Sequence, residues 1–323
     1  MQQLGEAELQ RALQKHPGLI PVGINAARQE LQWLDVGQFH FYEGFFHRSL
    51  NLHTGLRQKL SAPAAAFTTA LSVLDGDAVL TDNLAPTAFI FHAGRCGSTL
   101  LVKALAGLRA HVVFGEAAPH DAIWEVLTND WRVAVTPDST NLRRYRNLIL
   151  AMGRRRIAAQ RAHFIKFTSF NILLFDFIRQ AFPQVPQVFL YREPGATLAS
   201  YRQAQTGWQQ PELAEARRLL TGTSVATPED VLTDFYTAAL HGGLRLLNYA
   251  LLTPGVLPQL LRAWRVKITP EELSRMQVPF RYEAKADYGA HVYLQARRQG
   301  IELYRDARLK SLYHQLAHSP LNF

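Results

Sequence analysis

The sequence predicts an α/β fold with a mostly parallel central sheet. Three segments support this prediction, because each begins with a short apolar run that ends at glycine or polar residues: 89–105, 111–116 and 187–203. Such runs are typical of strands buried in a parallel sheet, and helical patterns follow the first and the third. Strands that alternate with helices along a chain form the parallel sheets of α/β proteins.

The segment FIFHAGRCGSTLLVKAL, residues 89–105, predicts an anion-binding site. Its first three residues suit a buried strand, two glycines follow in a tight loop, and an apolar-faced helix begins at Thr99. At such a junction successive backbone N–H groups point at one spot, and the helix dipole adds positive potential. Arg95 supplies a charge while Ser98 and Thr99 supply hydroxyl donors, so we expect a phosphate there. Taken alone, the segment also fits a turn that binds nothing.

Composition excludes several classes of protein. The chain has 323 residues, 48% hydrophobic and 19% charged, which is the range of a soluble globular protein with one large domain or a main domain and an appendage. No apolar run reaches the roughly 20 residues of a membrane span. The N-terminal residues lack the features of a signal peptide, and the single cysteine, Cys96, excludes an intrachain disulfide. We therefore expect a cytoplasmic enzyme with no membrane partner.

The formal net charge of +9 comes mostly from arginine clusters such as 143–146, 153–156, 217–218 and 297–298. Nucleic acid is one candidate partner for such a surface. The sequence contains no recognition motif, no zinc-ligand spacing and no basic stripe interleaved with aromatic residues, so we expect no nucleic-acid partner. A polyanionic cofactor and solvated helix faces explain the excess charge.

The loop GRCGSTLL resembles the 5′-phosphosulfate loop of sulfotransferases that use PAPS (3′-phosphoadenosine 5′-phosphosulfate). In the P-loop of an NTPase, lysine and then serine or threonine follow the last glycine. Here Ser98 follows Gly97, and the positive charge lies at Arg95. The resemblance implies that the donor-binding residues include Gly94, Arg95, Cys96, Gly97, Ser98 and Thr99.

A second motif, YREPGATLAS at 191–200, resembles the 3′-phosphate motif of the same family. Its Arg192 lies at the end of a predicted strand, and Ser200 lies eight residues later on a helix. A phosphomonoester carries up to two charges, and arginine binds it bidentately. The basic loop at 280–289 is a candidate to close over the nucleotide through Arg281 or Lys285, although the usual loop sequence of cytosolic sulfotransferases is absent.

Two further residues are predicted to take part in catalysis. Glu116 ends the strand HVVFGE, and ligands of open α/β sheets bind beyond the carboxyl ends of strands. Its place 17 residues after Thr99 is similar to that of the catalytic glutamate of tyrosylprotein sulfotransferases; a helix cap or a surface carboxylate is the alternative, with His120 as a second candidate base. Lys166 ends the strand HFIKF, and the resemblance implies that it stabilises the bridging oxygen of the leaving phosphate.

Residues 1–85 are predicted to be an N-terminal accessory segment. The sequence pattern predicts a helix through Leu9 and Leu13, a second helix near 25–34, a hairpin at 36–53 and a helix over 54–70. His40, His47 and His53 could form a metal cluster, but no cysteine or carboxylate joins them at ligand spacing, so surface histidines are favoured and no metal is expected.

The later elements follow from helix and strand patterns. We expect a helix over 139–162 and another from 170 to Pro183, which is preferred to a magnesium-binding strand ending at Asp176. Residues 204–250 are predicted to be mostly helical. A strand, a helix, a loop and a helix beginning at Pro270 are expected over 246–276. A terminal helix is expected over 290–317.

The resemblance implies a P-loop sulfotransferase-like three-layer fold over 86–323, with an α+β appendage at 1–85. It implies transfer of a sulfuryl group from PAPS to a hydroxyl, giving PAP, with Glu116 as base and with Arg95 and Lys166 as stabilising cations. A nucleotide kinase or NTPase with a degenerate loop and a non-catalytic nucleotide-binding protein are the alternatives. The sequence leaves open the oligomeric state and whether the acceptor is a small molecule, a sugar or a peptide.

Overall fold

A computed structural model describes residues 2–52, 55–56, 58, 66–203, 207–281 and 306–323. The chain forms two compact units. The first unit comprises Met1–Thr87, Leu108–Ile165 and Phe177–Val185. The second comprises Ala88–Gly107, Lys166–Asp176 and Pro186–Phe323. The predicted division between residues 85 and 86 stays a prediction.

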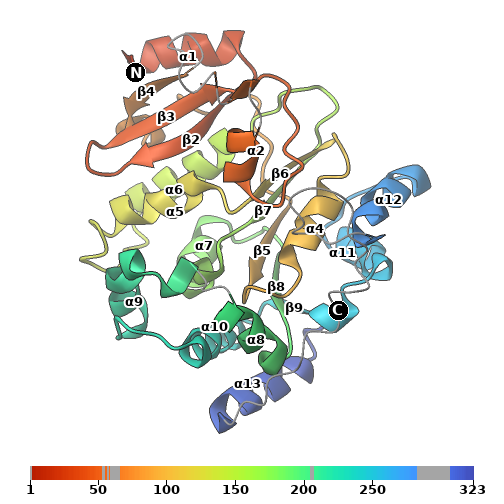
Figure 1. Ribbon diagram of the computed structural model, residues 1–323. Helices are drawn as coiled ribbons and strands as arrows, with labels where there is room; N and C mark the ends of the chain where they lie inside the picture. The colour runs from red at the N-terminus through yellow and green to blue at the C-terminus, as the bar shows by residue number, and fades with distance from the viewer. Residues whose placement is uncertain (1, 53–54, 57, 59–65, 204–206, 282–305) are drawn as a thin grey trace. The chain divides into compact units, whose positions relative to one another are not determined.

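A four-stranded sheet forms much of the first unit (Figure 1). Its strands, in spatial order, are β1 (Gln3–Leu4), β4 (Ala66–Ala70), β3 (Glu30–Asp35) and β2 (Leu19–Asn25). β1 is parallel to β4, and the other neighbours are antiparallel. Trp33 is fully buried, and its Nε1 donates to Thr69 Oγ1 at 3.0 Å, which joins β3 to β4.

Helix α1 (Glu6–Lys15) buries Leu9 and Leu13 and confirms the first predicted helix. The helix predicted near 25–34 is wrong, because these residues belong to the hairpin of β2 and β3. The chain turns between the strands at Gln29, whose φ is 52°. From Glu30 to Trp33 polar and apolar residues alternate, and the burial pattern there has the period of a strand.

The hairpin predicted at 36–53 is also wrong. Helix α2 (Phe46–Leu52) occupies its second half, and no strand is assigned within 36–52. The apolar residues there pack as an aromatic cluster, with ring centroids 5.2 Å apart for Phe41 and Phe46 and 5.1 Å apart for Phe41 and Phe114. Of the helix predicted over 54–70, the described residues 55–56 and 58 are helical, but β4 occupies the end of the segment.

No group of three or more His, Cys, Asp or Glu side chains among the described residues could hold a metal ion. His53 lies outside those residues. Helix α6 (Ser139–Met152) begins after Asp138, whose side chain accepts from the Asn141 N–H, and it ends ten residues earlier than predicted. Helix α5 (Ala118–Leu127) and helix α7 (Phe175–Ala181) complete the helices of this region.

The second unit is built on three parallel strands, β5 (Ala88–His92), β8 (Gln187–Tyr191) and β9 (Arg245–Asn248). Phe91 lies opposite Phe189, and Leu190 lies opposite Leu247. All of the residues of β5 are buried, which is expected of a central strand.

Two more strands precede β8 in sequence, β6 (His111–Gly115) and β7 (Ala162–Lys166). The N–H of Arg161 donates to Ala110 O at 2.8 Å where these strands begin. After β7 ends, the N–H of Phe167 donates to Ile90 O of β5 at 3.1 Å. The strand order is β6-β7-β5-β8-β9, so the predicted α/β fold with a mostly parallel sheet is confirmed.

The described helices of the second unit follow the predicted order, and residues 290–305 of the predicted terminal helix lie outside the described ranges. The described helices are α4 (Ser98–Leu105), the 3₁₀ turn η2 (Ser169–Leu174), α8 (Pro194–Gln203), α9 (Ala214–Thr221), α10 (Pro228–Gly242), α11 (Leu257–Ala263), α12 (Pro270–Gln277), η7 (Val278–Arg281) and α13 (Ala307–Ala317). Helix α12 begins at Pro270 as predicted, and Thr269 caps it in a reciprocal pair with Glu272. Across the described ranges, no helix has the length and apolarity that a membrane span requires.

Two buried histidines of the first unit, His120 and His163, have lowered pKa values. Both rings are at most 1% exposed, and burial lowers the pKa of each from 6.5 to about 3. The nearby Arg156 guanidinium lowers the pKa of His163 further, and His163 does the same to His120. The folded rings therefore stay neutral in a pH range where unfolded histidine binds a proton.

We expect the free energy of unfolding to fall as the pH drops from 6.5 toward 3. Each histidine contributes up to about 1.4 kcal/mol per pH unit, because the proton binds the unfolded chain only. Chemical denaturation between pH 4 and 7 measures this slope, which should be shallower in His163→Gln than in the wild type. The same substitution at the exposed His314 is the control. An equal slope in His163→Gln and wild type would contradict the prediction.

Candidate active site

The loop between β5 and α4 has an unusual backbone. Its φ angles are 78° at Gly94, 52° at Arg95 and 82° at Gly97. Glycine adopts this left-handed region without steric penalty, whereas Arg95 is strained there. Loops that combine left-handed and right-handed residues can turn successive N–H groups toward one anion, so this backbone is suited to an anion site.

The start of helix α4 leaves three backbone donors available. The carbonyl of Gly97 accepts from Leu100 and Leu101 at 2.9 and 3.2 Å. The N–H groups of Gly97, Ser98 and Thr99 bond to none of the residues that the structure describes. Ser98 and Thr99 are 5% and 4% exposed. Buried N–H groups are nearly always satisfied, so three of them at one helix start indicate a site for an anion.

His92 fixes the base of the loop. The N–H of Gly94 donates to His92 Nδ1 at 2.9 Å, and His92 Nε2 lies 3.0 Å from Phe167 O. Because Nδ1 accepts, the neutral ring carries its proton on Nε2, which donates to that carbonyl. The ring is 4% exposed. His92 therefore joins the loop to the chain that leaves β7.

Arg192 docks against the loop directly after β8. Its Nη1 donates to Arg95 O at 3.3 Å, and its guanidinium carbon lies 4.5 Å from the ring centroid of Tyr249. The Tyr236 hydroxyl donates to the backbone carbonyl of Arg192. No described carboxylate forms an ion pair with Arg192, so its remaining donors can meet an anionic ligand. The structure thus brings the two predicted arginines together.

Two tyrosine side chains press against the loop glycines. A Cβ at Gly97 would lie 2.8 Å from Tyr249 Cδ2 and 2.6 Å from Leu252 Cδ2. A Cβ at Gly94 would lie 2.9 Å from the hydroxyl of Tyr201, which donates to Ala93 O. Burial raises the pKa of Tyr201, so its hydroxyl keeps the proton that it donates.

Helix α8 carries Ser200, which is half-buried beside Tyr201. The start of this helix is closed by Glu193, whose carboxylate oxygens accept from the N–H groups of Gly195 and Ala196 at 2.9 and 2.8 Å. The N-terminal donors of α8 are therefore used within the protein. The motif resemblance assigns the Ser200 side chain of α8 to the 3′-phosphate, and this role stays a prediction.

Lys166 is the last residue of β7 and is 1% exposed. The following residue, Phe167, is bonded to Ile90 and His92 on the strand that leads into the loop. Cys96 is fully buried, and its Sγ donates to Leu190 O at 3.3 Å, so this thiol packs the loop against β8.

Glu116 lies in the first unit, directly after β6. It is half-buried, and its φ of 50° is in the left-handed region. His120 lies four residues later on α5 and is buried. Arg281 ends η7 and is exposed. Lys285 falls outside the described residues. The roles of these four residues stay predictions.

Four side chains of the site were missed in the sequence: His92, Tyr201, Tyr236 and Tyr249. Tyr201 directly follows Ser200 and His92 lies two residues before Gly94, and this proximity to predicted site residues was the available signal. Tyr236 and Tyr249 come from distant positions and have no motif around them. Their roles depend on contacts that only the folded chain makes.

The chain has structural neighbours among the solved protein structures. No protein-family model and no curated protein matches the chain. A sulfotransferase domain from the Synechococcus PCC 7002 olefin synthase is 18% identical, with 74% of this chain and 97% of that chain covered and a TM-score of 0.46. A sulfotransferase domain from the curacin biosynthetic pathway is 15% identical, with 73% and 99% covered and a TM-score of 0.44. Both of these structural neighbours are named as sulfotransferase domains.

Gly97 and Gly222 form a matched pair for testing the loop. Their φ angles are 82° and 81°, but a Cβ at Gly222 would meet nothing within 4 Å. We expect Gly222→Ala to cost roughly 1–2 kcal/mol of stability through backbone strain alone. Gly97→Ala should cost an additional 1–3 kcal/mol or so, because Tyr249 and Leu252 must move. Denaturant unfolding of both variants measures the difference, and equal losses would contradict this account.

Proposed function

We propose that this protein is a PAPS-dependent sulfotransferase that transfers a sulfuryl group to a hydroxyl and gives PAP. The observation that carries the proposal is the loop of residues 94–99. Three of its residues have positive φ, and three consecutive N–H groups at its helix end bond to none of the described residues. These donors, with two buried hydroxyls, suit the 5′-phosphosulfate of PAPS.

Arg192 and Ser200 would hold the 3′-phosphate of the nucleotide. Arg192 is anchored through one nitrogen to Arg95 O and by its ring contact with Tyr249. An arginine fixed in this way keeps its other donors in place for a bidentate contact with phosphate. Arg281 and Lys285 are proposed to add positive charge around the same phosphate on the basis of their sequence positions.

The proposed reaction forms a bond between the acceptor oxygen and sulfur and breaks the bond between sulfur and the bridging oxygen of the 5′-phosphate. Glu116 takes the acceptor proton, and its assignment rests on its sequence position after β6. Lys166 and Arg95 stabilise the negative charge that grows on the leaving phosphate. Gly97, Ser98 and Thr99 supply further donors to the same oxygens.

The acceptor is proposed to be a hydroxyl-bearing small molecule, sugar or peptide, and no metal is assigned to the reaction. A cytoplasmic location is part of the proposal and is supported by the use of the only cysteine, Cys96, in packing rather than in a disulfide. The lysine that a nucleotide kinase or NTPase places after the loop glycine is Ser98 here, which favours PAPS over ATP.

PAP binding tests the donor site. At 100 times its dissociation constant, PAP should stabilise the wild type by about 2.7 kcal/mol in thermal unfolding, whereas ADP and ATP with magnesium should give smaller shifts. Arg95→Ala should weaken PAP binding. Arg192→Gln should remove most of the difference in affinity between PAP and AMP, because the two ligands differ by the 3′-phosphate.

The control for the PAP experiment is Arg218→Ala, which removes an exposed arginine that pairs with Glu215. It should leave PAP affinity unchanged. Stabilisation by ATP with magnesium but not by PAP would reject the proposal in favour of the nucleotide kinases.

Turnover tests the catalytic assignments. Glu116→Gln should lower the rate of transfer from labelled PAPS by about 10²–10⁴, because the general base is lost, while PAP affinity is kept. Lys166→Met should lower it by roughly 10²–10³ through the lost stabilisation of charge. The assay uses a panel of phenols, sugars and tyrosine peptides.

Glu212→Gln, an exposed carboxylate on the second unit, is the matched control for the turnover measurements and should transfer at the wild-type rate. His120→Gln distinguishes the two candidate bases. A large loss in that variant, with none in Glu116→Gln, would move the base to His120. PAP binding with no transfer to any acceptor would favour the non-catalytic alternative.

A further inference from the structure

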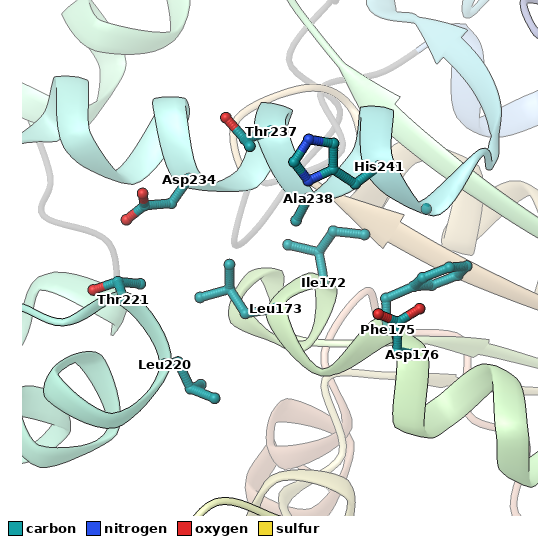
Figure 2. A pocket seen from close by; sticks show the side chains of 11 residues that line it. Ile172, Leu173, Phe175, Asp176, Leu220, Thr221, Asp234, Thr237, Ala238 and His241 are labelled. Atoms are coloured by element: carbon teal, nitrogen blue, oxygen red, sulfur yellow. The ribbon is translucent and has the colours of Figure 1, made fainter.

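The second unit contains a cavity of about 310 Å³ that the donor site does not use. One wall is a face of α10 that presents Asp234, Thr237, Ala238 and His241, which are spaced three or four residues apart and so share one side of the helix. Figure 2 shows Ala238 pointing from this helix toward Ile172 of η2. The volume is at the lower end of the range for small-molecule pockets.

The opposite side of the cavity is largely apolar. It is formed by side chains of η2, the start of α7 and the end of α9: Ile172, Leu173, Phe175, Asp176, Leu220 and Thr221. Gly242 closes one end, where a Cβ would lie 2.8 Å from Phe175 Cε1. An occupant of this cavity would therefore place an apolar body against η2 and polar groups against α10.

Asp234 gives the cavity its charge. This half-buried carboxylate forms no hydrogen bond or ion pair with any residue that the structure describes. Burial raises its pKa, the nearby Asp230 raises it further, and Arg308 opposes both. A partly desolvated carboxylate is stabilised by a cation that reaches it. Asp176 adds a second carboxylate to the lining.

Thr237 adds a hydrogen-bonding group beside Asp234. Its hydroxyl is buried and has no hydrogen-bond partner in the described ranges of the chain. A buried hydroxyl without a partner is unfavourable, and a ligand that donates to its oxygen would satisfy it. Asp234 and Thr237 are one turn apart, so one donor-rich group can meet both.

The chemistry of these groups selects the kind of cation. No set of three or more ligating side chains is placed to hold a metal ion in the described structure. The cavity instead combines a carboxylate, a hydroxyl and an apolar wall. An ammonium group has three N–H donors and no acceptor, so it complements Asp234 and Thr237. Because the whole chain carries a net charge of +9, a cation needs this local carboxylate to bind here.

We propose that this cavity binds a protonated amine that carries an apolar body. The ammonium group contacts Asp234 and Thr237, and the apolar body lies against Ile172, Leu173 and Leu220. The site is separate from the residues assigned to PAPS. It does not depend on the proposed sulfuryl transfer.

Calorimetric titration of the full chain with 2-phenylethylamine tests the proposal. We expect saturable binding that is at least 10-fold tighter than that of 2-phenylethanol or 3-phenylpropanoate, which have similar bodies and different head groups. Asp234→Asn should weaken amine binding at least 10-fold. Asp77→Asn, at an exposed carboxylate of the first unit, should leave it unchanged.

The variant Thr237→Val distinguishes a loss of amine binding from a loss of folding. Valine keeps the branched shape and removes an unsatisfied hydroxyl, so Tm should stay the same or rise while amine binding weakens several-fold. Equal affinity for the amine and the alcohol would overturn the proposal. So would unchanged amine binding in Asp234→Asn, or the absence of saturable binding to the wild type.

Discussion

The backbone conformation of residues 94–97 is the constraint on which the candidate site depends. Positive φ at Arg95 is unfavourable by roughly 1–2 kcal/mol, and such strain persists only where the surrounding structure imposes it. Here the carbonyls of the loop are held from outside. Arg192 bonds to Arg95 O, Tyr201 bonds to Ala93 O, and His92 accepts from the Gly94 N–H. With these groups fixed, the N–H groups of Gly97, Ser98 and Thr99 bond to none of the described residues and stay available to an anion.

The same contacts explain why the site needs aromatic side chains around two glycines. Tyr201 and Tyr249 lie so close to Gly94 and Gly97 that any Cβ would collide with them. Tyr249 also supports the Arg192 guanidinium, and Tyr236 holds the carbonyl of the same residue. The position of the Arg192 guanidinium therefore depends on how these tyrosine side chains pack against the loop. A side chain added at Gly97 would therefore act on Arg192 indirectly, by displacing Tyr249.

The sequence predicted the parts of the structure whose signals are local. The apolar runs of β5 and β8, the glycines of the loop and the start of α12 at Pro270 each depend on neighbours within a few residues. The first 70 residues were predicted less well, because the aromatic residues of 36–53 could equally line a strand or a packed cluster. The tyrosines of the site bond to partners 44 and 108 residues away. Neither a periodic pattern nor a local motif in the sequence can predict a contact between residues so far apart in the chain.

Helix α10 connects the two sites through adjacent residues. Tyr236 points to the Arg192 carbonyl, whereas Thr237, about 100° further around the helix, lines the cavity. Arg192 forms no ion pair with a carboxylate among the described residues, and Asp234 forms none with a cation among them, although Arg308 is near enough to lower the pKa of Asp234. A partly buried charge without a counter-charge destabilises a fold unless a ligand supplies the counter-charge. The chain therefore places one such charge of each sign in its second unit, and a phosphate and an ammonium group are the ligands that would compensate them.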